Sequence, residues 1–249
     1  EPTTGQAQVA PGVAVSVLEH PELGSATSDN SGAYALAVNG GGPLTLHYQK
    51  AATLGAQRQV ELRWHEFRKL QDVQLVSHNT GAATSIDMSV PGIHVARGIV
   101  QSDTRGTRQA TILIPSGTTS NDIPGNTWTF NITEFTVGPD GQRRMPGSLP
   151  DASGYTYAFA ADISQASGAH VTFNQPLVFY VQDFPNFKVG KKAPLGWYDD
   201  SAGLWRAESS GVVLHFLSTD PSTGKANIDT DGDGFADSAG VLAAFGITD

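Results

Sequence analysis

Short runs of alternating apolar and polar residues, each closed by a turn sequence, recur along most of this chain. The first run, Gly12–Leu18, alternates with a period of two, which is the spacing at which the side chains of a strand share one face. Turn sequences rich in Gly, Pro, Asn and Asp separate the runs, and the chain holds 28 Gly and 14 Pro but few helix-forming runs. These features predict an all-β protein with many short strands.

The length of 249 residues suits two modest domains better than one. A polar stretch rich in Gly, Ala, Ser and Thr predicts a linker between them. We therefore expect two β-sandwiches at 1–77 and 93–220, a linker at 78–92, and a calcium-binding loop with a short helix at 221–249. Strands are expected at 12–18, 33–38, 44–48, 58–62, 70–75, 94–100, 110–114, 128–135, 155–160, 170–173, 177–181, 195–198 and 212–217.

The densest group of carboxylates lies near the C-terminal end, in the sequence D-T-D-G-D-G-F-A-D. Alternate Asp residues around a turn bent at Gly234, followed by a carbonyl and a further Asp, can form an oxygen cage for a hard divalent cation. We predict a calcium site, and its expected ligands are Asp229, Asp231, Asp233, the Phe235 carbonyl and Asp237. A solvated Asp/Gly turn without an ion is the alternative, which the close packing of like charges disfavours.

The loop matches the first nine positions of an EF-hand-type loop, but Gly240 stands at position twelve, where a bidentate Glu is expected. Calcium loops without that Glu occur in thrombospondin type 3 and dockerin-like repeats, which this segment resembles. Residues 238–245 can form a short helix with Val241, Leu242 and Phe245 on one side. We expect bound calcium to hold this helix against the second sandwich.

Composition excludes several classes of partner and site. A net charge of -9, with only 15 Lys and Arg, argues against nucleic acid as a partner. No apolar run is long enough to insert in a membrane, and residues 1–4 lack a signal-peptide pattern, so any signal is expected upstream. The absence of cysteine removes disulfides and thiolate chemistry. A weak calcium loop favours a secreted or cell-surface location, where millimolar calcium is available.

The sequence indicates a protein that is not an enzyme. It holds no H-E-x-x-H, G-x-S-x-G, G-x-x-x-x-G-K-[ST] or G-x-G-x-x-G motif. The remote alternative is a self-cleaving domain, because His215 and Ser218 resemble the His, apolar, Ser order of such sites, with a spacing that is one residue too long.

A carbohydrate-binding module is the competing class of function. Trp197, Tyr198 and Trp205 lie near Asp199 and Asp200, so the aromatic rings could stack on a sugar while polar groups bind its hydroxyls. The alternative is that these aromatic residues face a core or a neighbouring sheet. The two adjacent carboxylates are weak candidates for a second calcium site, because successive side chains on a strand point to opposite faces.

Two resemblances to known families extend these predictions. The motifs G-V-x-V-x-V, T-S-D-N-S-G-A-Y and L-T-L-H-Y occur in order over about residues 8–76, which resembles the carboxypeptidase-regulatory or transthyretin-like β-sandwich. In that family the module is structural or adhesive and carries no catalytic group. The resemblance therefore implies a spacer or binding platform.

The remaining chain carries the phrases R-Q-A-T-I-L-I-P-S-G-T-T, T-E-F-T-V-G-P-D-G, M-P-G-S-L-P, S-G-Y-T-Y-A-F, V-F-Y-V-Q-D-F-P-N-F-K-V-G and P-L-G-W-Y-D. Together with the Asp loop, these resemble the N-terminal region of bacterial RHS/YD-repeat proteins over residues 94–249, and I-P-S-G also resembles the ZU5-type sandwich. Such proteins are secreted or surface polypeptides whose repeats form a hollow shell. The resemblance implies a non-catalytic accessory region whose partner is the remainder of that polypeptide, and a surface glycan or protein is a further candidate partner.

Overall fold

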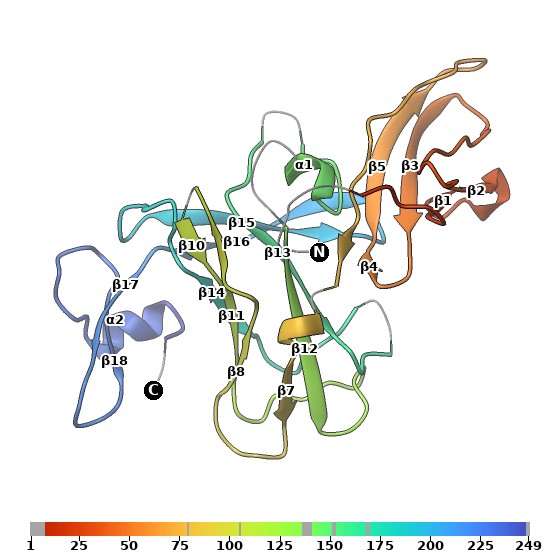
Figure 1. Cartoon of the computed structure of the whole chain (residues 1–249). Helices are drawn as coiled ribbons and strands as arrows, with labels where there is room; N and C mark the ends of the chain where they lie inside the picture. Colours follow the sequence, from red (N-terminus) through yellow and green to blue (C-terminus); the bar gives the residue numbers. More distant parts are fainter. Residues whose placement is uncertain are drawn as a thin grey trace. The chain divides into compact units, whose positions relative to one another are not determined.

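The computed structural model describes residues 8–78, 80–104, 106–135, 141–150, 153–167 and 170–247. These residues form antiparallel sheets with few short helices, which confirms the all-β prediction (Figure 1). The chain divides into two compact units. The first comprises residues 1–102, 107–182 and 198–205, and the second comprises 103–106, 183–197 and 206–249. None of the described helices is long and apolar enough to cross a membrane.

The first sheet forms from the N-terminal run of alternating residues. It has the order β2 (Ser25–Thr27), β1 (Ala14–Val17), β3 (Gly42–Gln49) and β5 (Ala56–Leu62). A short 3-10 helix, Pro21–Leu23, joins β1 to β2, while β4 (Thr53–Leu54) pairs with β6 (Val76–Ser77). Alternate residues of these strands point to one face, and the buried members of this core are Val13, Val15, Val17, Leu46, Tyr48 and Val60.

Two strands predicted for this domain are absent. Segments 33–38 and 70–75 have no strand assignment, although Tyr34, Leu36, Leu70 and other apolar residues in them pack against the first core. The alternating pattern of these segments therefore predicts which side chains are buried. A β-strand also needs a neighbouring strand with which its backbone can form hydrogen bonds in register, and these segments have none among the described residues. The amide of Gln74, for example, donates to the carbonyl of Arg143 at 3.1 Å.

A β-sandwich follows in the same unit. One sheet contains β8 (His94–Arg97), β11 (Ala110–Ile114) and β14 (Val178–Val181), in the order β14-β11-β8. The other contains β7 (Thr84–Asp87), β12 (Thr127–Phe135) and β13 (Ala158–Ile163), in the order β13-β12-β7. The two sheets share one buried core, formed by Ile86, Ala96, Ala110, Ile112, Ile114, Ile123, Trp128, Phe130, Ile132 and Ile163.

Several boundaries differ from the prediction in this region. The expected linker contains a 3-10 turn, Thr80–Ala82, and β7, which pairs with β12 and buries Ile86. The strand expected at 155–160 begins and ends three residues later, and 170–173 has no strand assignment. Residues 78–92 are predicted to be a linker because they are mostly polar. The short strand β7 forms there nevertheless, since the single buried side chain of Ile86 is enough to anchor it. The predicted domain boundaries themselves stay a prediction.

The remaining elements are β9 (Gln101–Asp103), β10 (Gly106–Arg108), α1 (Gly141–Arg144), β15 (Lys192–Asp199), β16 (Leu204–Val212), β17 (His215–Thr219), β18 (Ala226–Asp229) and α2 (Ala239–Ala244). The strand expected at 212–217 is interrupted, because Val213 and Leu214 connect β16 to β17. Ser238 caps α2 by accepting a hydrogen bond from the Val241 amide at 3.4 Å. No residue of α2 is buried, and the expected packing of this helix against the second sandwich stays a prediction.

Candidate metal centre

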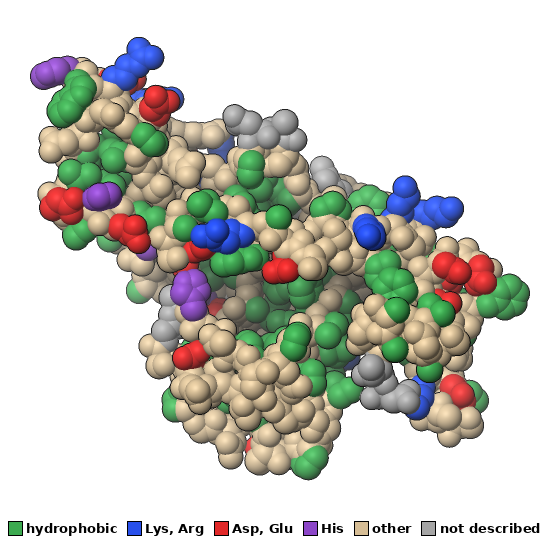
Figure 2. All heavy atoms as spheres, turned by 180° about the vertical axis from the view of Figure 1, so that it is seen from behind, with side chains coloured by type: hydrophobic (Ala, Val, Ile, Leu, Met, Phe, Trp, Pro, Cys, Tyr) green, Lys and Arg blue, Asp and Glu red, His purple; other side chains and the backbone are tan. Residues whose placement is uncertain are grey.

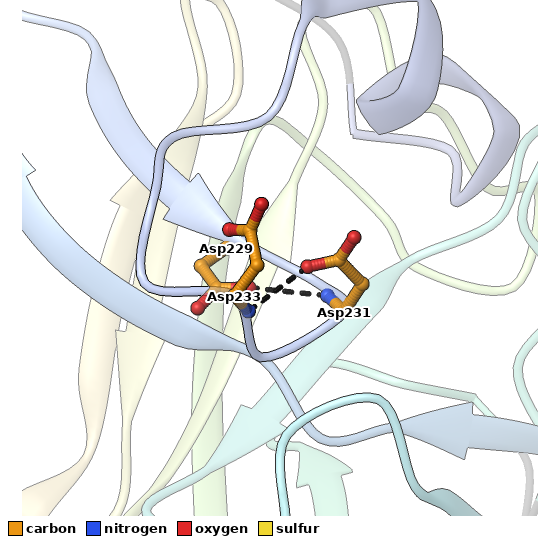
Figure 3. Close-up of side chains that lie close together, drawn as sticks. All are labelled: Asp229, Asp231 and Asp233. Atoms are coloured by element: carbon orange, nitrogen blue, oxygen red, sulfur yellow. Dashed lines mark hydrogen bonds between the residues drawn. The ribbon is translucent and has the colours of Figure 1, made fainter.

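Three of the five predicted calcium ligands come together at the end of β18. The carboxylates of Asp229, Asp231 and Asp233 each offer an oxygen, and these oxygens lie within 4.8 Å of one another (Figure 3). Strand β18 ends at Asp229, which is 1% exposed, whereas the other two side chains are exposed. In the described part of the chain this is the one group of three or more potential metal-ligating side chains.

The loop is folded around Asp229. Its Oδ1 atom accepts hydrogen bonds from the amides of Asp231 at 3.1 Å and Gly232 at 2.6 Å, and its Oδ2 atom accepts one from Gly234 at 3.0 Å. Both glycines have φ near +85°, a left-handed conformation that other residues rarely adopt. The D-x-D-G-D-G spacing therefore creates a tight turn in which several amides point at one carboxylate.

These amides also keep Asp229 ionised. The hydrogen bond from Gly232 is the largest cause that lowers the pKa of Asp229 below its ordinary value, and the amides of Gly234 and Asp231 act in the same direction. Three neighbouring carboxylates form a ligand set made of oxygen atoms. Such a set suits a hard cation such as Ca²⁺ better than it suits softer metal ions. The arrangement could hold a hard cation.

Asp237 and Phe235 are placed differently from the other predicted ligands. The Oδ2 atom of Asp237 accepts hydrogen bonds from the Thr230 amide at 2.7 Å and from the Thr230 hydroxyl at 2.6 Å. This contact closes the loop and keeps Asp237 outside the group of three carboxylates. Phe235 is exposed, and its amide donates to Asp233. The roles of Asp237 and of the Phe235 carbonyl as ligands stay predictions.

Sequence reasoning missed a second turn that supports the loop. Residues 188–191 line a surface pocket together with Thr230 and Asp231. A Cβ atom added to Gly190 would lie 3.2 Å from the Thr230 carbonyl oxygen, and one added to Gly232 would lie 3.4 Å from Cβ of Val189. The two backbones therefore approach as closely as glycine allows, and only the tertiary structure could place them together.

We expect Gly190→Ala to destabilise the second unit by about 1–2 kcal/mol, because Gly190 has φ +80° and its new methyl group would meet the loop backbone. Thermal unfolding measures the change. Gly224→Ala is the matched control, since Gly224 has φ +71° but nothing within 4 Å of an added Cβ. Equal destabilisation by both variants would mean that the contact with the loop contributes nothing.

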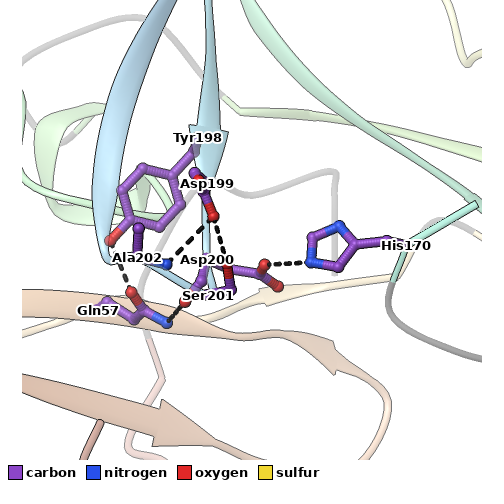
Figure 4. Close-up of polar contacts among 7 residues, drawn as sticks. All are labelled: Gln57, His170, Tyr198, Asp199, Asp200, Ser201 and Ala202. Carbon is purple, nitrogen blue, oxygen red and sulfur yellow. Dashed lines mark hydrogen bonds and ion pairs between the residues drawn. The ribbon is translucent and has the colours of Figure 1, made fainter. Parts of the chain in front are cut away.

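The turn between β15 and β16 holds a separate polar network (Figure 4). The Asp199 carboxylate accepts hydrogen bonds from the Ser201 hydroxyl at 2.6 Å and the Ala202 amide at 3.1 Å. Asp200 instead lies 3.0 Å from Nε2 of His170. The two carboxylates therefore have separate partners, one within the turn and one in an ion pair, and this arrangement offers no support for a second calcium site at the pair.

Gln57 connects this turn to β5. Its Nε2 atom donates to the Asp200 carbonyl at 2.8 Å, and its Oε1 atom accepts from the Tyr198 hydroxyl at 2.8 Å (Figure 4). Burial is the main cause that raises the pKa of Tyr198 to about 12. These contacts give Tyr198 a structural role in the first unit.

The aromatic residues predicted for glycan binding do not form one exposed platform. The Tyr198 and Trp205 rings lie 5.2 Å apart, and both are partly buried. The Trp205 indole donates to the Gly147 carbonyl at 3.4 Å. Trp197 alone is exposed, at 44%, with Arg206 at 6.0 Å from its ring. Two of the three rings are therefore partly covered within the first unit, and glycan binding through these residues stays a prediction.

His215 and Ser218 lie on β17, where a β-bulge falls between Phe216 and Ser218. The Ser218 hydroxyl accepts a hydrogen bond from Nδ2 of Asn227 at 2.9 Å. His215 pairs across the sheet with Asp229. Among the described contacts, none joins the His215 ring to the Ser218 hydroxyl, so the pair lacks the base–nucleophile contact that self-cleavage requires.

Comparison with known protein families gives a match for the first part of the chain. Residues 3–75 match the family described as the Teneurin TTR-like domain. This range covers the first sheet and its core but less than a third of the 249 residues. The expected transthyretin-like domain is therefore confirmed, as a β domain of the kind found in teneurins. No solved structure matches the chain significantly.

Proposed function

We propose that this chain is a non-catalytic, extracellular structural module of a bacterial RHS/YD-repeat polypeptide, and that its C-terminal unit is stabilised by Ca²⁺. The match of residues 3–75 to a TTR-like domain supports a structural role, because such domains are typically scaffolds rather than enzymes. The order of motifs over residues 94–249 supports the RHS/YD assignment and a secreted or surface location. The expected partner is the remainder of the polypeptide.

The calcium role rests on one observation: the oxygens of Asp229, Asp231 and Asp233 lie within 4.8 Å of one another. Like charges at this separation repel, so the loop by itself carries an electrostatic cost that a divalent cation would remove. Bound Ca²⁺ would supply charge neutralisation and a cross-link between these carboxylates. The amides of Gly232 and Gly234 already hold Asp229 in place, so the chain provides a partly organised site.

Calcium titration by calorimetry tests this role. We expect saturable binding to chelator-treated protein with a dissociation constant in the range of about 0.1–1 mM, as in extracellular calcium modules. A hundredfold excess of calcium over that constant should stabilise the folded state by about 2.7 kcal/mol, which raises the unfolding midpoint by about 5 °C or more.

The Asp231→Ala and Asp233→Ala double variant should lose both the heat of binding and the thermal shift. Asp220→Asn is the matched control, because Asp220 forms a similar turn with Ser222 outside the cluster. Binding that survives in the double variant, or no thermal shift of the native chain at a hundredfold excess of calcium over that dissociation constant, would reject the calcium role.

A further inference from the structure

Two large aromatic side chains are displayed on the loop that follows β5, at residues Arg63–Lys69. Phe67 is 92% exposed and Trp64 is 68% exposed. We call this segment the basic aromatic loop. Neighbouring exposed aromatic residues leave apolar area in contact with water, which a binding partner would remove. The loop therefore has a feature that neither the TTR-like fold nor the calcium site explains.

The loop is held in a defined conformation. The Arg63 amide donates to Oε2 of Glu66 at 2.9 Å, and Nη1 of Arg68 donates to the Glu61 carbonyl at 2.8 Å. A Cβ atom at Gly41 would lie 3.0 Å from Nε1 of Trp64, so the indole ring rests directly on the backbone there. Because these contacts are made within the chain, binding through the loop would lose little conformational entropy.

The charge of the loop is opposite to that of the whole chain. Its seven residues include three basic side chains, one acidic side chain and one histidine, whereas the chain has a net charge of -9. Figure 2 shows basic, acidic, histidine and hydrophobic side chains at the upper left, where the loop beyond β5 lies. The excess of two positive charges on these seven residues favours an anionic partner at the loop itself.

The shape of the loop favours a bilayer over a protein as that partner. Phe67 is 92% exposed and Trp64 is 68% exposed, so most of the surface of each ring projects into solvent. A protein partner would need a complementary cavity, whereas a lipid interface deforms around a projecting ring. Aromatic and basic side chains are also the residues that proteins place at membrane interfaces.

We propose that the basic aromatic loop docks peripherally on an anionic lipid bilayer. The rings of Trp64 and Phe67 would enter the interface, while Arg63, Arg68 and Lys69 would contact the headgroups. This attachment would span no membrane and would not need calcium, so it is independent of the proposed calcium role.

Co-sedimentation with vesicles tests the proposal. The 249-residue chain is mixed, in chelator and at low salt, with vesicles of phosphatidylcholine alone or with about 30 mol % phosphatidylserine. We expect binding only to the anionic vesicles, weakened by added salt. Phe67→Ala should weaken it about tenfold, and Lys69→Glu should weaken it at least about fivefold.

The controls are Phe187→Ala and Lys192→Glu, which remove an exposed aromatic ring and an exposed basic group from other parts of the chain. Both should bind like the native chain. Phe67 is almost fully exposed, so its truncation should leave the unfolding midpoint unchanged and loss of binding would not reflect unfolding. Absence of binding to anionic vesicles would overturn the proposal. So would an unaltered affinity of Phe67→Ala, or loop-dependent binding to poly-glutamate without binding to vesicles, which would indicate an acidic protein partner.

Discussion

The variant Glu134→Ala is expected to destabilise the β-sandwich by about 3–5 kcal/mol. Glu134 on β12 and Arg108 on β10 form an ion pair with an Nε–Oε1 distance of 2.6 Å. Their side chains are only 6% and 2% exposed. Removal of one partner leaves the other charge in a region of low dielectric constant, where the lost attraction cannot be replaced by water.

Tyr157 is partly buried and interacts electrostatically with both charges of this pair. Burial is the main cause that raises its pKa, and the negative charge of Glu134 adds to the rise. The phenol therefore stays neutral. A neutral hydroxyl cannot replace the carboxylate as the counter-charge of Arg108, so Tyr157 does not rescue the single variant.

Urea unfolding followed by tryptophan emission measures the change, since Trp128 lies in the core of the same sandwich. The double variant Arg108→Met with Glu134→Leu should recover much of the lost stability, because it removes both charges together. Glu208→Ala, at an exposed position, provides the control. A loss below about 1 kcal/mol for Glu134→Ala would show that the pair is solvated in solution.

The second large effect is expected at Asp229. The variant Asp229→Ala should weaken calcium binding on the order of a hundredfold, because it removes both a ligand and the acceptor of three loop amides. Asp231→Ala removes one ligand but leaves this set of hydrogen bonds around Asp229 largely in place. We therefore expect the calcium-free unfolding midpoint to fall for Asp229→Ala more than for Asp231→Ala.

Calorimetry and thermal unfolding in chelator separate these two effects. If Asp229→Ala loses calcium binding but keeps the calcium-free unfolding midpoint of the native chain, Asp229 is a ligand but does not organise the loop. Normal binding in this variant would contradict both. The lowered pKa of Asp229 adds a pH test: its contribution to stability is present above the ordinary carboxyl range and should be lost only as the pH falls below about 4.

Several features followed from local sequence. The strand predicted at 110–114 has the observed ends, and the strands predicted at 44–48, 58–62 and 128–135 were found within two residues of theirs. Alternation identifies such strands because it records which residues face a core. The Asp loop was also predictable, since its carboxylates, amides and glycines lie within nine residues of one another.

Other features depended on residues distant in the sequence. Segment 33–38 has the alternation of a strand but no paired ladder, because a ladder requires a second backbone in register. Asp237 matches a ligand position but is held by Thr230. The partial burial of Tyr198 and Trp205 likewise depends on distant residues, such as Gln57 and Gly147, that contact these side chains.

By itself the sequence determined the β class, most strand positions and the clustering of three carboxylates, because each arises from side-chain spacing over a few residues. Only the tertiary structure decided that Gly190 supports the loop, that Arg108 and Glu134 are buried together, and that Phe67 is left exposed. These properties depend on which distant backbones approach each other and on what covers each side chain. A local pattern carries no information about either.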